Sequence, residues 1–170
     1  MTETCLIIAE VGVNHNGEIS KALELVAAAS EAGADVVKFQ AFSVDELVSK
    51  GTPMAAYQRR GSGLQDQESL LRGLEFGVGD WERIADECLS RSVEFLATAF
   101  DPLNLDMLMR IGLRRIKIPS GEITNLILLR KISEYDCPVI MSTGMAATEE
   151  VAQALEILIK AHSVPRAIDL

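Results

Sequence analysis

The stretch Val93-Glu94-Phe95-Leu96-Ala97-Thr98, followed by Asp101-Pro102, Gly112 and Arg115-Ile116-Lys117-Ile118, decides the fold. Its first six residues form a short apolar run that indicates a buried strand. Asp101-Pro102 indicates the start of a helix, because aspartate can cap the first backbone N–H groups and proline fits the first helical position. Gly112 ends this helix, and the run from Arg115 to Ile118 indicates a second strand. A strand, a helix and a strand in this order predict two parallel strands.

The same alternation recurs along the whole chain. The predicted strands are residues 6–10, 35–40, 93–98, 115–118 and 139–142, and the predicted helices are residues 20–32, 81–90, 101–112, 125–134 and 148–161. Ser20 and Asp80 are the expected N-caps of the first two helices. Five strand–helix units in succession predict an α/β fold with a parallel sheet covered by helices.

A parallel sheet of this kind is either an open, doubly wound layer or a closed (β/α)8 barrel. No GxGxxG or GxxxxGK[ST] motif follows any strand, so the usual signals of nucleotide-binding open sheets are missing. Polar residues instead recur at the carboxyl end of every strand, as the active site of a barrel requires. We therefore expect a TIM-barrel type fold with about five of its eight units present, because a full barrel needs about 250 residues. An open sheet is the alternative.

One connection is much longer than the others. Ala41 to Gly79 exceeds the ~2–6 residues that usually join a strand to a helix, and it contains several glycines. Its middle, Gln67 to Leu74, is predicted to form a short helix. We expect the segment to be the most mobile or irregular part of the chain, either as a lid over the strand ends or as a plain surface excursion.

Composition limits the classes of function. The chain has 170 residues, of which 48% are apolar, which suits one domain with a sizeable core. A net charge of -9 argues against a nucleic-acid or anionic-membrane partner. The first residues do not resemble a signal peptide, and no apolar run approaches the ~20 residues of a membrane span. Three distant cysteines without a CxxC pair predict reduced, buried thiols, and we expect a cytoplasmic protein.

Two lysines interrupt apolar strands. Lys38 and Lys117 each lie inside a buried run, where lysine is rare without a partner. The two-residue period of a strand places Lys38 and Gln40 on the same face. Two cations pointing toward a common strand-end cavity would bind a compact dianion. The alternative is that each lysine pairs structurally with a carboxylate, the candidates being Glu10, Glu94 and Glu122.

Further polar groups follow the strands. Thr98, Ser120-Gly121 and Ser142-Thr143-Gly144 offer hydroxyls and accessible N–H groups that suit phosphate or carboxylate oxygens. Glu10 and Glu122 could do acid–base work or contact a metal-bound water, or they could be salt-bridge partners.

The chain has two histidines. His15 lies in a turn after the first strand and is either bonded to the backbone there or available for chemistry. His162 lies near the end of the chain. The two do not have metal-ligand spacing, so we expect no complete metal site.

Four segments in this order resemble the sialic acid synthases, the bacterial N-acetylneuraminate synthases and their legionaminate and pseudaminate relatives. They are Ile8-Ala9-Glu10-Val11-Gly12-Val13-Asn14-His15-Asn16-Gly17, Val37-Lys38-Phe39-Gln40, Lys117-Ile118-Pro119-Ser120-Gly121-Glu122-Ile123-Thr124-Asn125 and Met141-Ser142-Thr143-Gly144-Met145. The resemblance runs from about Leu6 to about Ala161. The Ser-Gly-Glu-Ile-Thr-Asn segment is more similar to the N-acetylneuraminate and legionaminate members than to the pseudaminate ones.

The resemblance implies a fold and a reaction. Members of this family have a (β/α)8 barrel followed by an antifreeze-like domain that reaches the other subunit of a dimer. Residues 1–170 would then be an incomplete N-terminal barrel domain without the antifreeze-like domain, and we expect a homo-oligomer. The implied activity is that of a transferase that condenses phosphoenolpyruvate with N-acetylmannosamine or a related 2-acetamido sugar and releases phosphate. A divalent metal, Mn²⁺ or Mg²⁺, is expected for the family.

The resemblance also assigns roles to residues. The residues expected to hold phosphoenolpyruvate are Lys38, Thr98, Lys117, Ser120 and Ser142, with Gln40 supporting the site. Glu10 would face the sugar, and Glu122 would contact metal-bound water. The expected catalytic set is therefore Glu10, Lys38, Lys117 and Glu122.

This sequence departs from the family pattern at two places. Ala99 stands where many members have proline, which leaves Thr98 in place. After about Ala161 the chain no longer resembles the approach to a sixth strand, and the family's two metal-binding histidines are missing. We therefore expect weak anion binding and no turnover by the isolated chain. The alternatives are a legionaminate or other nonulosonate synthase, another barrel aldolase, and a non-catalytic fragment that only binds a small anion.

Overall fold

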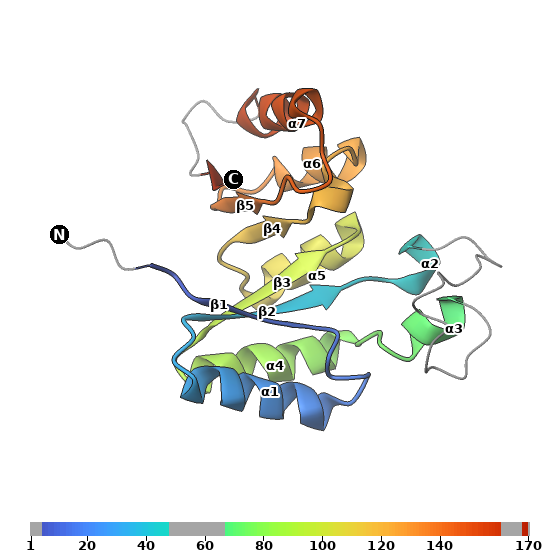
Figure 1. Cartoon of the computed structure of the whole chain (residues 1–170). Coiled ribbons are helices and arrows are strands. Elements are labelled where there is room, and N and C mark those ends of the chain that lie inside the picture. The colour runs from blue at the N-terminus through green and yellow to red at the C-terminus, as the bar shows by residue number, and fades with distance from the viewer. Residues whose placement is uncertain (1–4, 48–66, 161–167, 170) are drawn as a thin grey trace.

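Parallel strands alternate with helices along the chain. The computed structural model describes residues 5–47, 67–160 and 168–169. Its strands are β1 (Ile8–Gly12), β2 (Val36–Ala41), β3 (Glu94–Ala99), β4 (Ile116–Ile118), β5 (Val139–Met141) and β6 (Ile168–Asp169). Its helices are α1 (Ile19–Glu31), α2 (Val44–Leu47), α3 (Gln67–Arg72), α4 (Val78–Ser90), α5 (Pro102–Ile111), α6 (Leu126–Ile132) and α7 (Thr148–Lys160), with a short 3-10 turn, η1 (Ser120–Glu122). The predicted α/β fold with parallel strands is confirmed (Figure 1).

The strands form two small sheets rather than one continuous layer. Their orders are β1-β2-β3 and β4-β5-β6, and every pair is parallel. The sheets adjoin between β3 and β4, where Arg115 contacts Glu94 through Nε (2.5 Å) and Nη2 (2.8 Å). Among the described residues β1 and β6 do not pair, so these residues do not form a closed barrel.

The chain forms one strand more than expected. Ile168 and Asp169 pair in parallel with Val139 and Ile140 of β5. The expectation that the chain after Ala161 does not approach a sixth strand is therefore wrong. Two residues are too few to produce a readable strand pattern, because periodicity needs several alternations.

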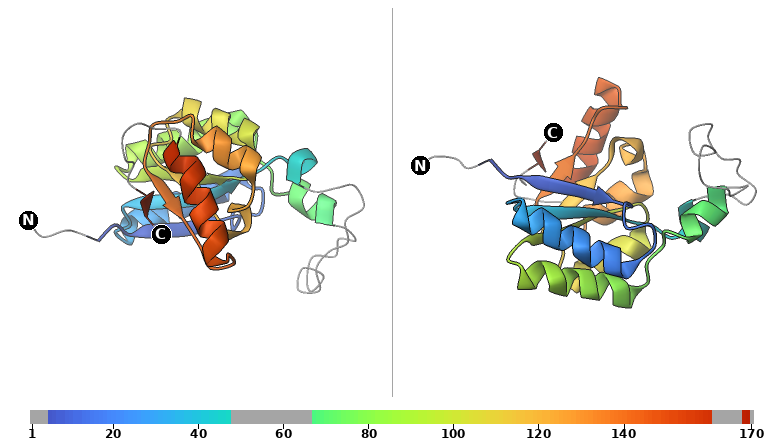
Figure 2. Two further views of the ribbon diagram at one scale, coloured as in Figure 1. Left: turned by 90° about the horizontal axis from the view of Figure 1, so that it is seen from above. Right: turned by 60° about the horizontal axis from the view of Figure 1, so that its bottom comes forward.

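Helices α1 and α4 cover one face of the first sheet (Figures 1 and 2). The core beneath them contains Phe39, Trp81 and Ile84, all almost fully buried. Phe39 points into this core from β2, so Lys38 and Gln40 must point to the opposite face. The predicted alternation along this strand is confirmed.

One predicted helix cap is confirmed and two are wrong. The Asp101 side chain accepts a hydrogen bond from Asn104 N (2.8 Å) at the start of α5, and Gly112 ends that helix with a φ of +113°. Ser20 does not cap α1, because Ala22 N already donates to Glu18 O (3.1 Å) and Ser20 lies inside the first turn. Asp80 likewise lies inside α4, since its own N–H donates to Gly77 O (3.1 Å).

The cysteines follow the prediction only in part. Cys88 is buried in α4, and burial raises the pKa of its thiol to about 12, with a further contribution from Glu87. Cys5 is exposed, because it precedes β1 and lies outside the sheet. No described helix is long and apolar enough to cross a bilayer.

The long connection after β2 contains ordered elements at both ends. The predicted helix within residues 67–74 is confirmed as α3, whereas α2 was not predicted. Arg72 contacts Asp45 (2.5 Å) and so joins the two helices, which lie beyond the carboxyl end of β2 (Figure 1). Residues 48–66 lie outside the described residues, and the lid stays a prediction. The flanking residues Phe42 and Phe76 lie outside helices and strands, as an irregular segment would, but both are buried.

The turn between β1 and α1 anchors the end of this connection. His15 is fully buried, its Nδ1 accepts a hydrogen bond from Gly17 N (3.0 Å), and its ring stacks on Phe76 with 4.1 Å between centroids. The structural interpretation of His15 is therefore confirmed, and burial lowers its pKa. Gly17 has a φ of +77°, and a Cβ there would lie 1.9 Å from Gly73 O. The contact requires glycine.

We predict that Gly17→Ala destabilises the chain more than Gly33→Ala. Both glycines have positive φ (+77° and +83°), so an alanine at either position is strained by about 1–2 kcal/mol in its backbone conformation. A Cβ on Gly33 meets nothing within 4 Å, whereas one on Gly17 collides with the backbone of Gly73. Gly17→Ala should therefore lower the free energy of unfolding by about 1–3 kcal/mol more than its control, measured by urea denaturation. Equal losses of unfolding free energy in the two variants would show that the close contact between Gly17 and Gly73 does not contribute to stability.

Candidate functional site

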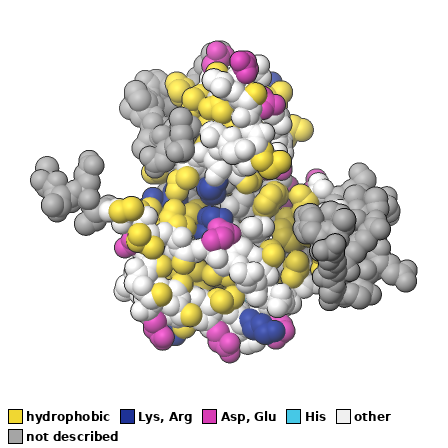
Figure 3. All heavy atoms as spheres, viewed as in Figure 1, with side chains coloured by type: hydrophobic (Ala, Val, Ile, Leu, Met, Phe, Trp, Pro, Cys, Tyr) yellow, Lys and Arg dark blue, Asp and Glu magenta, His cyan; other side chains and the backbone are white. Residues whose placement is uncertain are grey.

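The strand-end residues singled out in the sequence lie on neighbouring strands. In the first sheet Glu10 pairs in register with Lys38, and Gln40 pairs with Thr98. Lys117 lies on β4 in the second sheet, and its pKa is influenced by the charges of both Lys38 and Glu10. Val37 and Phe39 on β2 and Ile116 and Ile118 on β4 are buried in one core, so the alternation along each strand turns both lysines to the side away from that core. Figure 3 shows basic side chains near the centre of one face, with an acidic side chain beside them and apolar side chains around them.

Lys38 has a carboxylate partner. Its Nζ forms an ion pair with Glu10 Oε2, and its side chain is 13% exposed against 48% for Glu10. The structural interpretation that the sequence left open thus applies to Lys38. Because Glu10 is half-exposed, its carboxylate can turn toward solvent or a ligand, and the largely buried ammonium of Lys38 then needs another anion as its partner.

Gly12 makes room for this pair. The strand carries an irregularity between Glu10 and Gly12, and Gly12 has a φ of +57°. A Cβ on Gly12 would lie 3.1 Å from Glu10 Oε1 and 3.3 Å from Gln40 Nε2. Both the Glu10 carboxylate and the Gln40 amide therefore lie close to the space that the missing side chain of Gly12 leaves open, a role that sequence analysis did not assign to this glycine. The only available signal was the glycine two residues after Glu10.

Lys117 is held without a carboxylate. Its Nζ donates to Ser142 Oγ (2.5 Å) and to Ile118 O (2.7 Å), and this carbonyl also accepts from Ser142 N (3.0 Å). No salt bridge to Lys117 occurs among the residues that the structure describes. Burial, and to a smaller extent the positive charge of Lys38, lower the pKa of Lys117 from its ordinary 10.5 to about 8, while Glu10 acts in the opposite direction. Lys117 is therefore partly neutral just above physiological pH.

The remaining predicted site residues form no hydrogen bond or ion pair with the two lysines among the interactions of the described residues. Thr98 is 2% exposed on the face of Gln40, and Ser120 begins η1. Glu122 ends η1, and its Oε2 accepts from Asn125 Nδ2 (2.8 Å), while Asn125 caps α6. Nothing in these contacts joins Glu122 to the lysines, so its expected role with metal-bound water stays a prediction. Glu94 pairs with Arg115 rather than with a lysine.

The described residues do not form a metal centre by themselves. No group of three His, Cys, Asp or Glu side chains converges within residues 5–47 and 67–160. His15 is enclosed by aromatic rings and uses Nδ1 to accept from the backbone. His162 lies outside the described residues. The metal expected for the family therefore has no ligand set that can be assigned here.

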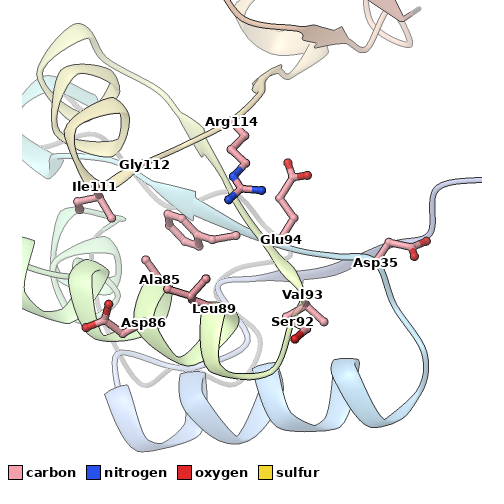
Figure 4. A pocket seen from close by; sticks show the side chains of 11 residues that line it. Asp35, Ala85, Asp86, Leu89, Ser92, Val93, Glu94, Ile111, Gly112 and Arg114 are labelled. Carbon is pink, nitrogen blue, oxygen red and sulfur yellow. The ribbon is translucent and has the colours of Figure 1, made fainter.

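A separate pocket opens at the other end of the strands (Figure 4). It is lined by charged side chains that precede or begin the strands, including Asp35, Glu94 and Arg114, and by the ends of α4 and α5. Lys38 and Lys117 do not line it. In folds of this class the ligand sites lie beyond the carboxyl ends of the strands, so we place the candidate site at the lysines rather than in this pocket.

Comparison with known proteins establishes the family. The model of the NeuB family matches residues 25–168. This chain belongs to the NeuB family. The predicted resemblance to sialic acid synthases is confirmed.

Named relatives of this NeuB-family chain include two synthases of one type. The chain is 44% identical to the N,N'-diacetyllegionaminic acid synthase of Legionella pneumophila, covering 90% of this chain and 43% of that protein. It is 39% identical to the synthase of the same name from Campylobacter jejuni, covering 91% and 47%. The chain thus spans less than half the length of these curated relatives.

A solved structure of a related synthetase has a similar fold. The N-acetylneuraminic acid synthetase of Leptospira borgpetersenii, crystallised with citrate, superimposes with a TM-score of 0.76 at 29% identity. The match covers 95% of this chain and 54% of that one.

We predict that Lys38→Met raises the pKa of Lys117 from about 8 toward 10.5. The variant removes a neighbouring positive charge and leaves the Glu10 carboxylate without its partner, and both changes favour the protonated amine. An increase of about 1 pH unit is expected from NMR titration of the lysine side chains. The matched control is Lys131→Met, which removes a lysine paired with Asp106 and Glu134 on the helical surface. A Lys117 titration unchanged by Lys38→Met would contradict the shared site.

Proposed function

We propose that this chain supplies the phosphoenolpyruvate-binding part of a nonulosonate synthase. The observation that carries the proposal is that Lys38 and Lys117 lie on one side of the strands and that, among the described residues, only Lys38 of the two has a carboxylate partner, Glu10. Such a site has an uncompensated positive charge in a partly buried setting. A compact anion with a phosphate and a carboxylate group neutralises it, and phosphoenolpyruvate carries both groups.

The contacts of the site support this binding mode. Lys117 already donates to Ser142 Oγ (2.5 Å), so an incoming phosphate oxygen meets an ammonium and a hydroxyl that are held together. Lys38 lies on the adjoining sheet and can take the second anionic group when Glu10 turns outward. Thr98 and Ser120 supply further hydroxyls at neighbouring strand ends, and Gln40 supports the Glu10 carboxylate.

The reaction that we propose joins two carbon atoms. C3 of phosphoenolpyruvate attacks the aldehyde carbon of the sugar, positive charge develops at C2, water adds there, and phosphate leaves by cleavage of its C–O bond. Lys38 and Lys117 hold the anionic groups throughout, which stabilises the developing charge distribution. Glu10 faces the sugar and Glu122 manages the proton of the water. The divalent metal of the family, Mn²⁺ or Mg²⁺, has no described ligands here, and no step is assigned to it.

The sugar that we propose carries two acetamido groups. The relatives at 44% and 39% identity are named as synthases of N,N'-diacetyllegionaminic acid, whereas the sialic acid synthetase with a solved structure is 29% identical. A diacetamido hexose is therefore the first candidate. N-acetylmannosamine, the sugar first expected from the resemblance, is the second.

Catalysis by this family would need more than the matched segment. The relatives are more than twice as long as the part that this chain matches. We propose that the described strands belong to a (β/α)8 barrel in a cytoplasmic homo-oligomer. On that view the 170-residue chain by itself binds phosphoenolpyruvate weakly and does not turn it over.

We predict that phosphoenolpyruvate binding is coupled to proton uptake. A bound dianion favours the ammonium form of Lys117 and raises its pKa above about 8, so the complex takes up a proton at a pH just above that value. Affinity should therefore fall as pH rises through this range. Calorimetry in two buffers of different ionisation enthalpy measures the uptake.

Two variants, one at Lys117 and a control at Lys131, isolate the contribution of Lys117 to binding. Lys117→Met should weaken binding roughly 10- to 100-fold, because one charged hydrogen-bond donor is lost, and should abolish proton uptake. Lys131→Met should change neither quantity. Binding that is independent of pH and of Lys117 would contradict the assignment.

A chimaeric enzyme tests the activity itself. Residues 6–161 of this chain replace the matching segment of the Legionella pneumophila synthase, and phosphate release is measured with each sugar. We expect activity that is higher with the diacetamido hexose than with N-acetylmannosamine. Lys117→Met in the chimaera should reduce the rate by roughly 100-fold or more, while Lys131→Met should leave it unchanged. A folded chimaera that binds phosphoenolpyruvate but releases no phosphate would count against the proposed reaction.

A further inference from the structure

Lys117 differs from the other lysines whose side chains the structure describes. Lys21 pairs with Glu18 (2.6 Å), Lys38 pairs with Glu10, and Lys131 pairs with Asp106 (3.0 Å) and with Glu134 (2.9 Å). Lys117 instead has two uncharged acceptors, the Ser142 hydroxyl and the Ile118 carbonyl. In this part of the chain its ammonium form therefore lacks the carboxylate that stabilises the others.

The surroundings of Lys117 favour the neutral amine. On β4 the flanking Ile116 and Ile118 are 2% and 0% exposed on the opposite face of the strand, and Lys117 itself is only partly exposed. The charged groups that act on it are Lys38 from β2, which opposes the ammonium form, and Glu10 from β1, which favours it but is already paired with Lys38. A lysine that is partly desolvated and next to another cation is the usual form of an activated amine nucleophile.

We propose that Lys117 is a nucleophilic lysine that forms an imine with small anionic carbonyl compounds, of which the 2-oxo acids are the class that fits. This goes beyond the proposed condensation, in which no covalent bond to the protein forms.

The covalent step balances without a further reagent. The neutral Nζ attacks the carbonyl carbon, a C–N bond forms, and the carbonyl oxygen takes up a proton to give a carbinolamine. The hydroxyl group then leaves as water, and a protonated imine remains. The Ser142 hydroxyl, 2.5 Å from Nζ, is placed to pass protons in both stages.

The neighbouring charge explains the preference for an anionic carbonyl compound. In a 2-oxo acid the carboxylate is attached directly to the carbon that Nζ attacks, so it must lie close to Lys117 in the imine. Lys38 is the nearby cation that can accept it. A neutral aldehyde or ketone gains nothing from Lys38, and this difference separates directed capture from general amine reactivity.

Borohydride trapping tests the proposal on the full 170-residue chain. The chain is incubated with pyruvate and sodium borohydride, which supplies hydride and converts the imine to a stable secondary amine, and the products are mapped by peptide mass spectrometry. We expect one adduct per chain, located at Lys117, formed more than about tenfold faster than any adduct at Lys131 or Lys21. The rate should rise with pH and level off above about 8, where the amine is neutral.

Variants and a second reagent complete the test. Lys117→Arg should abolish the adduct while retaining the native circular dichroism spectrum, and Lys38→Met should slow trapping several-fold because the amine becomes more basic and the carboxylate loses its cation. Lys131→Met should have no effect. Acetone, a ketone without a carboxylate, should show a weaker preference for Lys117 over Lys131 than pyruvate does.

Two results would overturn the proposal. One is labelling spread over the surface lysines and the terminal amine with no preference for Lys117, which the wild-type map reveals even if a variant fails to fold. The other is an equal preference for Lys117 over Lys131 with pyruvate and with acetone. Trapping needs neither phosphoenolpyruvate nor a sugar, so its failure leaves the proposed synthase function untouched, and an inactive chimaera leaves the trapping result untouched.

Discussion

Two lysine ammonium groups share one side of the strands with a single paired carboxylate, and this imbalance of charge governs the chemistry of the site. Glu10 neutralises Lys38, and Lys117 must then be accommodated with uncharged acceptors only. A cation in this position costs free energy of folding because desolvation is not repaid by an ion pair. The folded chain responds by holding Lys117 at a pKa of about 8 rather than its ordinary 10.5. Between these values the unfolded chain binds more protons, so the contribution of Lys117 to stability increases with pH.

The segment from Glu10 to Gly17 connects this site to the long excursion after β2. Glu10 pairs with Lys38, and Gly12 leaves open the space beside the Glu10 carboxylate and the Gln40 amide. A few residues later His15 stacks on Phe76, and Gly17 lies against Gly73 at the returning end of the excursion. One turn therefore fixes both the acidic member of the site and the base of the excursion. A shift of this turn would move both together.

Local rules predicted those features of the fold that depend on neighbours in sequence. The alternation in Val36–Ala41 was enough to place Lys38 opposite the helices, and Asp101-Pro102 was enough to start α5. Ser20 failed as a cap because the helix begins two residues earlier, with the carbonyl of Glu18. A side chain that can cap does not reveal which residue starts the hydrogen-bonded series.

Pairing across strands could not be predicted in the same way. Glu10, Glu94 and Glu122 were equivalent candidates for partners of the lysines, yet only Glu10 fills that role. Glu94 lies at the start of β3 beside Arg115, and Glu122 is turned toward Asn125 by η1. These choices depend on where along its strand each carboxylate stands and on which strands adjoin, which is information about register that a single sequence does not contain.

The same imbalance makes the two proposed properties of Lys117 mutually exclusive. A phosphate-bearing dianion supplies the missing negative charge, returns the proton to Lys117 and removes the lone pair that attack on a carbonyl carbon requires. A 2-oxo acid brings only one negative charge, and Lys38 can absorb it while Lys117 stays neutral and reactive. The charge of the ligand thus decides whether Lys117 acts as a cation or as a nucleophile. Bound phosphoenolpyruvate would protect the amine from 2-oxo acids, because the groups that hold the phosphate are the groups that an imine would occupy.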